Sequence, residues 1–328
     1  MIMTPYARAL VLAAAIAAAA PAMALPAHAV LRAGHSHMRG GPTDSGFDAF
    51  ASELAKLSSG RIEVKVFPEG ELGDEFSMSR SVIEGKLDIC MVGGQMIEGL
   101  YHPYAATNIP YIFDGYDHLK AFIRSDGARK ALLEASSASG FTGLWLEATA
   151  PRSFFAKFPV TSPEDLKGLV IRVPESDMSI RTARLLGATP NPLSTMETYT
   201  ALEHSVIDGA ENNFVYYVQE RYYEVAPVFS DDMHSMSPNV VILSEKTRKE
   251  MTAKEWEWVE KAAKAGREAQ IRAYEAEYIK LRGFARELGI EVVEVDRKPF
   301  IEATRRLMAE CLSDPSIAEV VKAIDAVR

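Results

Sequence analysis

Arg172 is the residue whose position most clearly favours an anionic ligand. It lies in the segment Leu169–Pro174, where residues 169, 171 and 173 are apolar and Arg172 points to the opposite face of a predicted strand. Ligands gather at the carboxyl ends of strands in α/β sheets, and a guanidinium can hold a carboxylate through two parallel hydrogen bonds. A structural ion pair is the alternative explanation of this arginine.

Two further polar residues adjoin aromatic ones. Arg152 stands between Pro151 and two phenylalanines, and Asn212 precedes a stretch that contains Tyr216. Amides bond to hydroxyl groups and aromatic rings cover the apolar face of a sugar, so this pattern suits a sugar acid or a hydroxy acid. The simpler interpretations are a surface arginine and an asparagine in a turn.

Sequence signatures of catalysis and of metal binding are missing. None of G-x-S-x-G, G-x-x-x-x-G-K-[ST], H-E-x-x-H or C-x-x-C occurs. His35 and His37 share one side of a strand because they are two residues apart, but no third ligand accompanies them. We therefore expect no metal and no cofactor.

The composition limits the partners of the chain. Its 328 residues carry 45 acidic and 36 basic side chains, for a net charge of −9. This balance disfavours nucleic acid and anionic membranes, since both select a basic surface. The two cysteines, Cys90 and Cys311, exclude a disulfide-rich scaffold and leave either one disulfide or two buried thiols.

The N-terminus has the pattern of a secretory signal peptide over residues 1–29. Arg8 precedes the apolar run Ala9–Ala20, which is shorter than the ~20 residues needed to span a bilayer. Ala27–Ala29 is a cleavage motif, and Ala22–Ala24 is a second one. The sequence predicts an exported protein.

The rest of the chain alternates strand and helix signals, which is typical of an α/β fold with helices on mixed sheets. Expected strands are 30–35, 61–67, 87–92, 168–173 and 207–212, and expected helices are 47–57, 75–84, 196–205 and one from residue 174 or 175 to 187. Segments 83–88 and 202–208 resemble each other weakly, which hints at two similar lobes. The absence of a flexible linker suggests several chain crossings, as in a hinge beside a small-molecule cleft.

A long helix is expected near the C-terminus. Thr252 and Glu255 form a capping box, and the run Ala253–Leu288 contains no proline. About 36 helical residues would reach roughly 54 Å, which exceeds one compact lobe. The helix should lie along both lobes or break near Gly283.

The chain resembles the extracytoplasmic solute-binding proteins of TRAP transporters. The motifs that carry this resemblance, in order, are Gly70–Glu75, Glu84–Asp88, Ser162–Pro174, Leu186–Pro190, Glu197–Leu202 and Ile207–Asn213. The resemblance implies a two-lobe periplasmic-binding-protein-like α/β fold with mixed sheets, a hinge and a long helix spanning both lobes. Lobe I is expected to comprise residues 30–149 and roughly 238–277, and lobe II residues 150–237 and roughly 278–328.

The resemblance also implies a ligand site. Arg172 matches the arginine that pairs with the ligand carboxylate, Arg152 a second arginine 20 residues upstream, and Asn212 an asparagine 40 residues downstream. Further expected contacts are Glu75, Ser36, His37 and Tyr216.

The expected function is capture of a small organic anion, with a uronate or related sugar acid as the best candidate, and its delivery in the periplasm to small and large TRAP membrane subunits. We expect a monomer that is not an enzyme. The alternatives are a C4-dicarboxylate-binding or keto-acid-binding member of the same family, a secreted hydrolase or lyase with Glu75 or a histidine as base, and a ligand-sensing partner of a membrane receptor.

Overall fold

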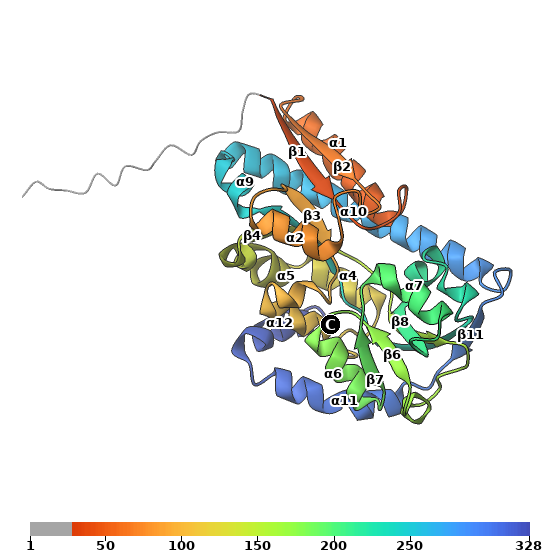
Figure 1. Cartoon of the computed structure of the whole chain (residues 1–328). Helices are drawn as coiled ribbons and strands as arrows, with labels where there is room; N and C mark the ends of the chain where they lie inside the picture. Colours follow the sequence, from red (N-terminus) through yellow and green to blue (C-terminus); the bar gives the residue numbers. More distant parts are fainter. Residues whose placement is uncertain (1–27) are drawn as a thin grey trace, which may run out of the picture.

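The computed structural model describes residues 28–328 and contains two β-sheets, each covered by helices (Figure 1). The expected signal peptide, apart from His28 and Ala29, lies outside the described residues. Among residues 28–328, no helix is both long enough and apolar enough to cross a membrane. The mixed α/β architecture predicted from the sequence is confirmed.

The first sheet has the strand order β2-β1-β3-β10-β4. Strands β1, β2 and β3 run parallel, and β10 is antiparallel to both β3 and β4. Helices bury both faces, which explains why β3 and β10 are apolar or fully buried along their length. The bounds are β1 Ala29–Gly34, β2 Ile62–Phe67, β3 Ile89–Val92, β4 Phe141–Glu147 and β10 Asn239–Ser244.

The second sheet has the strand order β11-β9-β5-β8-β6-β7. Strand β5 is antiparallel to its neighbours β8 and β9, whereas β6 is parallel to β7 and β8. This register brings the start of β5 beside the ends of β8 and β9. The bounds are β5 Arg152–Ala156, β6 Val170–Val173, β7 Thr189–Pro192, β8 Gly209–Asn213, β9 Val228–Ser235 and β11 Glu291–Glu294.

Twelve α-helices are found in residues 28–328, and all five of the expected ones are present. One begins later than predicted: α6 begins at Asp177 because the side chain of Ser176 caps it by accepting from the Ser179 N–H. The bounds are α1 Pro42–Leu57, α2 Glu75–Ile83, α3 Ala105–Asn108, α4 Tyr116–Arg124, α5 Asp126–Ala128, α6 Asp177–Leu185, α7 Thr195–Glu203, α8 Phe214–Gln219, α9 Glu245–Glu250, α10 Ala253–Phe284, α11 Lys298–Cys311 and α12 Pro315–Asp325.

Helix α10 runs along both sheets, as predicted (Figure 1). The Thr252–Glu255 capping box begins it, and it ends after 32 residues, one residue beyond Gly283 rather than at Leu288. It packs against α1 and β4 on the first sheet and against α8 on the second. At the crossing from β4 to β5, the amide of Gln270 accepts from the Ala148 N–H at 3.1 Å and donates to the Ala148 carbonyl at 2.9 Å.

The C-terminal helix departs from the expected lobe boundaries. The sequence places residues 278–328 in lobe II, but α12 packs against α3 and α5 beside the first sheet. Its apolar side chains Ile317, Val320 and Ile324 join the same core cluster as Phe122. An amphipathic helix buries its apolar face equally well against either lobe, so its sequence pattern cannot specify which one. The rest of the lobe division stays a prediction.

The two cysteines are both buried free thiols. Cys90 lies in β3 and Cys311 ends α11, and both belong to the core cluster beside the first sheet. Of the two alternatives left open by the sequence, the structure has the buried thiols.

Candidate ligand-binding site between the two sheets

A cavity of about 210 Å³ lies between elements of the two sheets. The structure brings all seven of the predicted contact residues to its wall, although their role as ligand contacts stays a prediction. These residues are Arg172, Arg152, Asn212, Glu75, Ser36, His37 and Tyr216.

Arg172 projects from β6 into this wall and is only 3% exposed. Its Nε and Nη2 donate to the carbonyl of Leu193 at 2.9 and 2.6 Å. Within residues 28–328 no carboxylate lies within 4.0 Å of this guanidinium, and its Nη1 donates no hydrogen bond. Burial lowers the pKa of Arg172, as expected for a cation that lacks a counter-charge. The structural ion pair considered for Arg172 is therefore not found.

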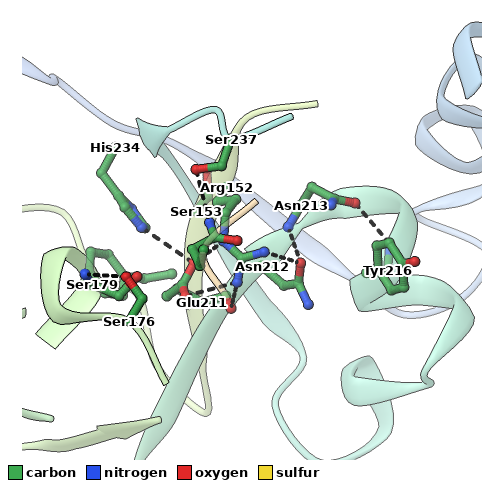
Figure 2. A network of polar contacts seen from close by, with 12 residues as sticks. Arg152, Ser153, Ser176, Ser179, Glu211, Asn212, Asn213, Tyr216, His234 and Ser237 are labelled. Carbon is green, nitrogen blue, oxygen red and sulfur yellow. Dashed lines mark hydrogen bonds and ion pairs between the residues drawn. The ribbon is translucent and has the colours of Figure 1, made fainter. Parts of the chain in front are cut away.

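Arg152, in contrast, is held by Glu211 (Figure 2). Its Nε and Nη2 donate to the two carboxylate oxygens at 2.6 and 2.8 Å, and Nη2 also donates to the Glu211 carbonyl at 3.0 Å. Its Nη1 donates to Oδ1 of Asn212 at 2.8 Å. The antiparallel register of β5 and β8 sets up this fork. Arg152 thus has a structural ion pair and also lines the cavity.

His234 and Asp232 of β9 extend this pair into a buried quartet with Arg152 and Glu211. His234 Nδ1 lies 2.8 Å from Asp232 Oδ2, and its Nε2 lies 3.5 Å from Glu211 Oε2. Burial alone would lower the pKa of His234, but Asp232 and Glu211 raise it to about 9. Burial likewise opposes ionisation of Glu211, yet Arg152 and His234 hold its pKa well below the usual range. The quartet therefore holds two positive and two negative charges and is neutral as a whole.

The Asn212–Tyr216 segment places polar and aromatic groups on the same wall (Figure 2). Asn212 Oδ1 accepts from Arg152 and from the Asn213 N–H, so its Nδ2 is the group left to donate to a ligand. Asn213 caps α8 by accepting from the Tyr216 N–H at 3.0 Å. The Tyr216 ring packs edge-on against His37, with centroids 4.4 Å apart.

Glu75 begins α2 on the opposite wall. Its Oε1 accepts from Ser36 Oγ and its Oε2 from the Gly93 N–H, each at 2.8 Å. A Cβ at residue 93 would lie 3.0 Å from Oε2, so glycine there lets the carboxylate approach the backbone. Burial raises the pKa of Glu75. With both oxygens used by this chain, Glu75 is placed as a fixed acceptor.

His35 and His37 follow β1, which ends at Gly34, and they differ in position. His37 lines the cavity and bonds through Nδ1 to Thr43 Oγ1 at 2.9 Å. His35 is fully buried, with its Nε2 3.2 Å from Asp44 Oδ1 and its ring stacked on Phe47, so it does not line the cavity. Among residues 28–328 no group of three possible metal ligands occurs.

Several lining residues were not found from the sequence. Ser237 accepts a hydrogen bond from Gln95, and its carbonyl accepts one from Thr149. A Cβ at Gly94 would lie 2.4 Å from the carbonyl of Pro238, so this glycine permits close contact with the β9–β10 crossing. These groups lie on loops without periodicity, which is why no local signal marked them. The lining residues absent from the prediction include Gln95, Thr149, Glu220, Ser237 and Asn239.

Comparisons with known proteins identify the family. The model of the bacterial extracellular solute-binding protein family 7 matches residues 33–314. The sialic acid-binding periplasmic protein SiaP of Vibrio cholerae is 31% identical over 265 residues, which are 79% of this chain and 81% of that protein.

Solved structures give the same result. A TRAP periplasmic solute-binding protein from Xanthobacter autotrophicus with bound β-D-galacturonate has 30% identity and a TM-score of 0.86, covering 91% of this chain and 100% of the other. One from Anaerococcus prevotii with bound D-glucuronate has 30% identity and a TM-score of 0.88, covering 91% and 98%. The chain therefore belongs to family 7 of the bacterial extracellular solute-binding proteins, the family of TRAP solute-binding components.

Proposed function

We propose that this protein binds a monocarboxylate sugar acid of the uronate class in the cavity and delivers it to TRAP membrane subunits. The observation that carries the proposal is the single uncompensated guanidinium of Arg172 in the cavity wall. A carboxylate can replace water on its free N–H groups, and such charge-assisted bonds are among the strongest available. The uronates bound to the two similar solved proteins support the same ligand class.

The charge balance favours one carboxylate over two. The quartet around Arg152 is already neutral, so only one positive charge remains to be matched. The opposite wall presents Glu75, and Glu69 and Glu220 also line the cavity. A second carboxylate of a C4-dicarboxylate would meet these acidic groups without a free cation, which costs binding energy. Hydroxyl groups of a sugar acid, however, can donate to them.

We further propose binding without turnover, by a monomer in the periplasm after removal of a signal peptide within residues 1–29. Glu75 bonds to Ser36 and Gly93, and His35 is buried against Asp44, so two of the three bases considered for a hydrolase or lyase are already occupied by groups of this chain. Strand β1 begins at Ala29, so cleavage after Ala24 would leave the strand whole. The division into two lobes is part of this proposal, with residues 315–325 returning to lobe I.

Isothermal titration calorimetry against a ligand panel tests the proposal. The panel is D-galacturonate, D-glucuronate, D-galactose, succinate and pyruvate. We expect a uronate to bind at least about 100-fold more tightly than galactose, because only the acid engages Arg172. Tightest binding by succinate or pyruvate would contradict the ligand class. Proton NMR of a bound uronate over a day should show it unchanged, and conversion would contradict a pure binding role.

A second test separates delivery from sensing. Reconstituted TRAP membrane subunits should take up labelled uronate only when this protein is present. Uptake that is independent of the protein would favour the receptor-linked alternative.

A further inference from the structure

Three side chains form a hydrogen-bonded series behind the first-sheet wall of the cavity, the wall that carries Ser36, His37 and Glu75. His37 Nδ1 is 2.9 Å from Thr43 Oγ1, and Thr43 Oγ1 is 2.8 Å from Glu147 Oε2. Glu147 ends β4 and Thr43 lies in the first turn of α1, and both are buried. Of the three, only His37 lines the cavity, so Thr43 and Glu147 act on a ligand through the imidazole.

The two hydrogen bonds of Thr43 must run in one donor-to-acceptor direction because its hydroxyl has a single hydrogen. A carboxylate oxygen can only accept, and an ionised one is the stronger acceptor available to that hydrogen. Thr43 therefore donates to Glu147 and must accept at its own oxygen from His37. This places the imidazole proton on Nδ1, which leaves Nε2 as a bare lone pair.

This direction holds for the ionised form of Glu147. Burial raises the pKa of Glu147 to about 7, while Thr43 and Asn239 favour its ionised form and Glu75 opposes it. Its Oε1 is buried and has no hydrogen-bond partner among residues 28–328, whereas Oε2 is engaged by Thr43. A proton on Oε2 would instead donate to Thr43, so the direction given above is that of the protein above about pH 7, which is where the tautomer is to be measured.

His37 also stays neutral in this setting. Burial, with a smaller contribution from His35, lowers the pKa of His37 well below its ordinary value. Its Nε2 makes no hydrogen bond within residues 28–328, although the ring lines the cavity. When a neutral imidazole carries its proton on Nδ1, its Nε2 offers the ligand an acceptor and no donor.

We propose that His37 is a specificity-determining residue that accepts a hydrogen bond from one hydroxyl of the bound sugar acid, with Thr43 and Glu147 as positioning residues that fix its tautomer. This inference rests on the proposed uronate function and adds which partner donates the hydrogen bond in one contact. A ligand with an acceptor but no hydrogen at that ring position should be rejected. A donor imidazole would instead tolerate it.

Deoxy and deoxyfluoro uronates distinguish the two polarities in the wild-type protein. Fluorine can accept a hydrogen bond weakly but cannot donate one. Replacing a hydroxyl group with fluorine therefore removes the hydroxyl hydrogen and keeps a polar atom at that position. We expect at least one ring position at which the deoxy and the fluoro analogue both bind roughly 10- to 100-fold more weakly than the parent uronate. Fluoro analogues that bind like the parent at every position would overturn the proposal.

Variants assign that position to His37. In His37→Ala the deoxy and fluoro penalties at the critical position should fall to within about twofold, while penalties at other positions stay. The matched control His204→Ala removes an exposed histidine and should keep the whole wild-type pattern. Unchanged penalties in a folded His37→Ala protein would overturn the role of His37.

The tautomer is measured directly by ¹⁵N NMR of the histidine rings in the ligand-free protein. His37 should have a protonated Nδ1 and an unprotonated Nε2, and Thr43→Val should mix the two tautomers without unfolding the chain. This readout also separates the two proposals. If no uronate binds, the proposed function fails, and an Nε2-protonated His37 overturns the present inference whether or not a uronate binds.

Discussion

The two walls of the cavity are built differently. The second-sheet wall carries its charged groups on strand ends, where the side chains of Arg152 and Arg172 are buried. They donate to β8 and to the β7–α7 connection, respectively. The first-sheet wall carries Ser36, His37 and Glu75 on loops and at a helix start, and these groups are partly exposed. One wall therefore supplies a fixed charge, and the other supplies hydroxyl, imidazole and carboxylate groups.

This difference indicates a division of tasks. A carboxylate common to many ligands is best met by rigid elements, because charge pairing needs fixed geometry in a dry environment. Loops change more easily without loss of the fold, so they suit the recognition of hydroxyl patterns that differ between sugars. The predictions below test this division, beginning with the largest expected effect.

Glu211→Gln should destabilise the second-sheet wall most strongly. The change leaves Arg152 and His234 as buried positive charges with only Asp232 to balance them. Breaking one side of a buried pair costs about 3–5 kcal/mol, which lowers the melting temperature by roughly 10 °C. Glu63→Gln, at an exposed carboxylate beside His28, is the control and should cost less than about 1 kcal/mol. Equal melting temperatures for the two variants would show that the quartet does not stabilise the fold.

Arg172→Ala should affect binding rather than folding. Its guanidinium is tied to one backbone carbonyl only, so the fold loses little, but the ligand carboxylate loses its counter-charge. We expect affinity for the cognate uronate to fall by about 2–4 kcal/mol, or roughly 30- to 1000-fold, in calorimetry. The exposed Arg184→Ala is the matched control. Near wild-type affinity for Arg172→Ala would refute the charge role of this wall.

His234→Asn should give a stability loss that depends on pH. The pKa of His234 is about 9 in the folded chain, above the ordinary value of 6.5, so its charged form adds stability below about pH 6.5 and that stability is lost as the pH rises through 9. The difference in unfolding free energy between wild type and variant should be about 3 kcal/mol at pH 6 and shrink toward pH 10. Thermal melts across this range measure it. A difference that is constant with pH would show that folding does not raise the pKa of His234.

Ser36→Ala should have the smallest effect, on the loop-built wall. It removes one of the two donors to Glu75, and the Gly93 N–H still holds the other carboxylate oxygen. A net hydrogen bond is worth about 1 kcal/mol, so uronate affinity should fall roughly fivefold. Ser313→Ala, at an exposed serine, should leave affinity unchanged. A loss of uronate affinity as large as that expected for Arg172→Ala would contradict the proposed difference between the two walls.

Features encoded locally could be predicted from the sequence. Alternation in β6 places Arg172 on its own face, and the Thr252–Glu255 box begins α10. The weak similarity of segments 83–88 and 202–208 also has a structural counterpart. Asp88 accepts from the Arg32 N–H of β1, and Asp208 accepts from the Val170 N–H of β6, so each aspartate ties a helix–strand turn to a neighbouring strand.

Features that depend on long-range register could not be predicted. Glu211 is 59 residues from Arg152, and only the antiparallel β5–β8 pairing makes them partners. His234 joins them because β9 lies on the other side of β5. Thr43 and Glu147 are 104 residues apart and have no pattern of their own. The sequence pattern indicates that a side chain leaves a strand, but not which charge it meets.

The Gln270 contact has a mechanical consequence. Because the amide of Gln270 bonds to both backbone groups of Ala148, the connection from β4 to β5 is held against the middle of α10. The residues left between this contact and β5 are Thr149–Pro151, where the ring of Pro151 restricts its own backbone. At this connection, a change in the angle between the two sheets therefore has at most these three residues about which to turn.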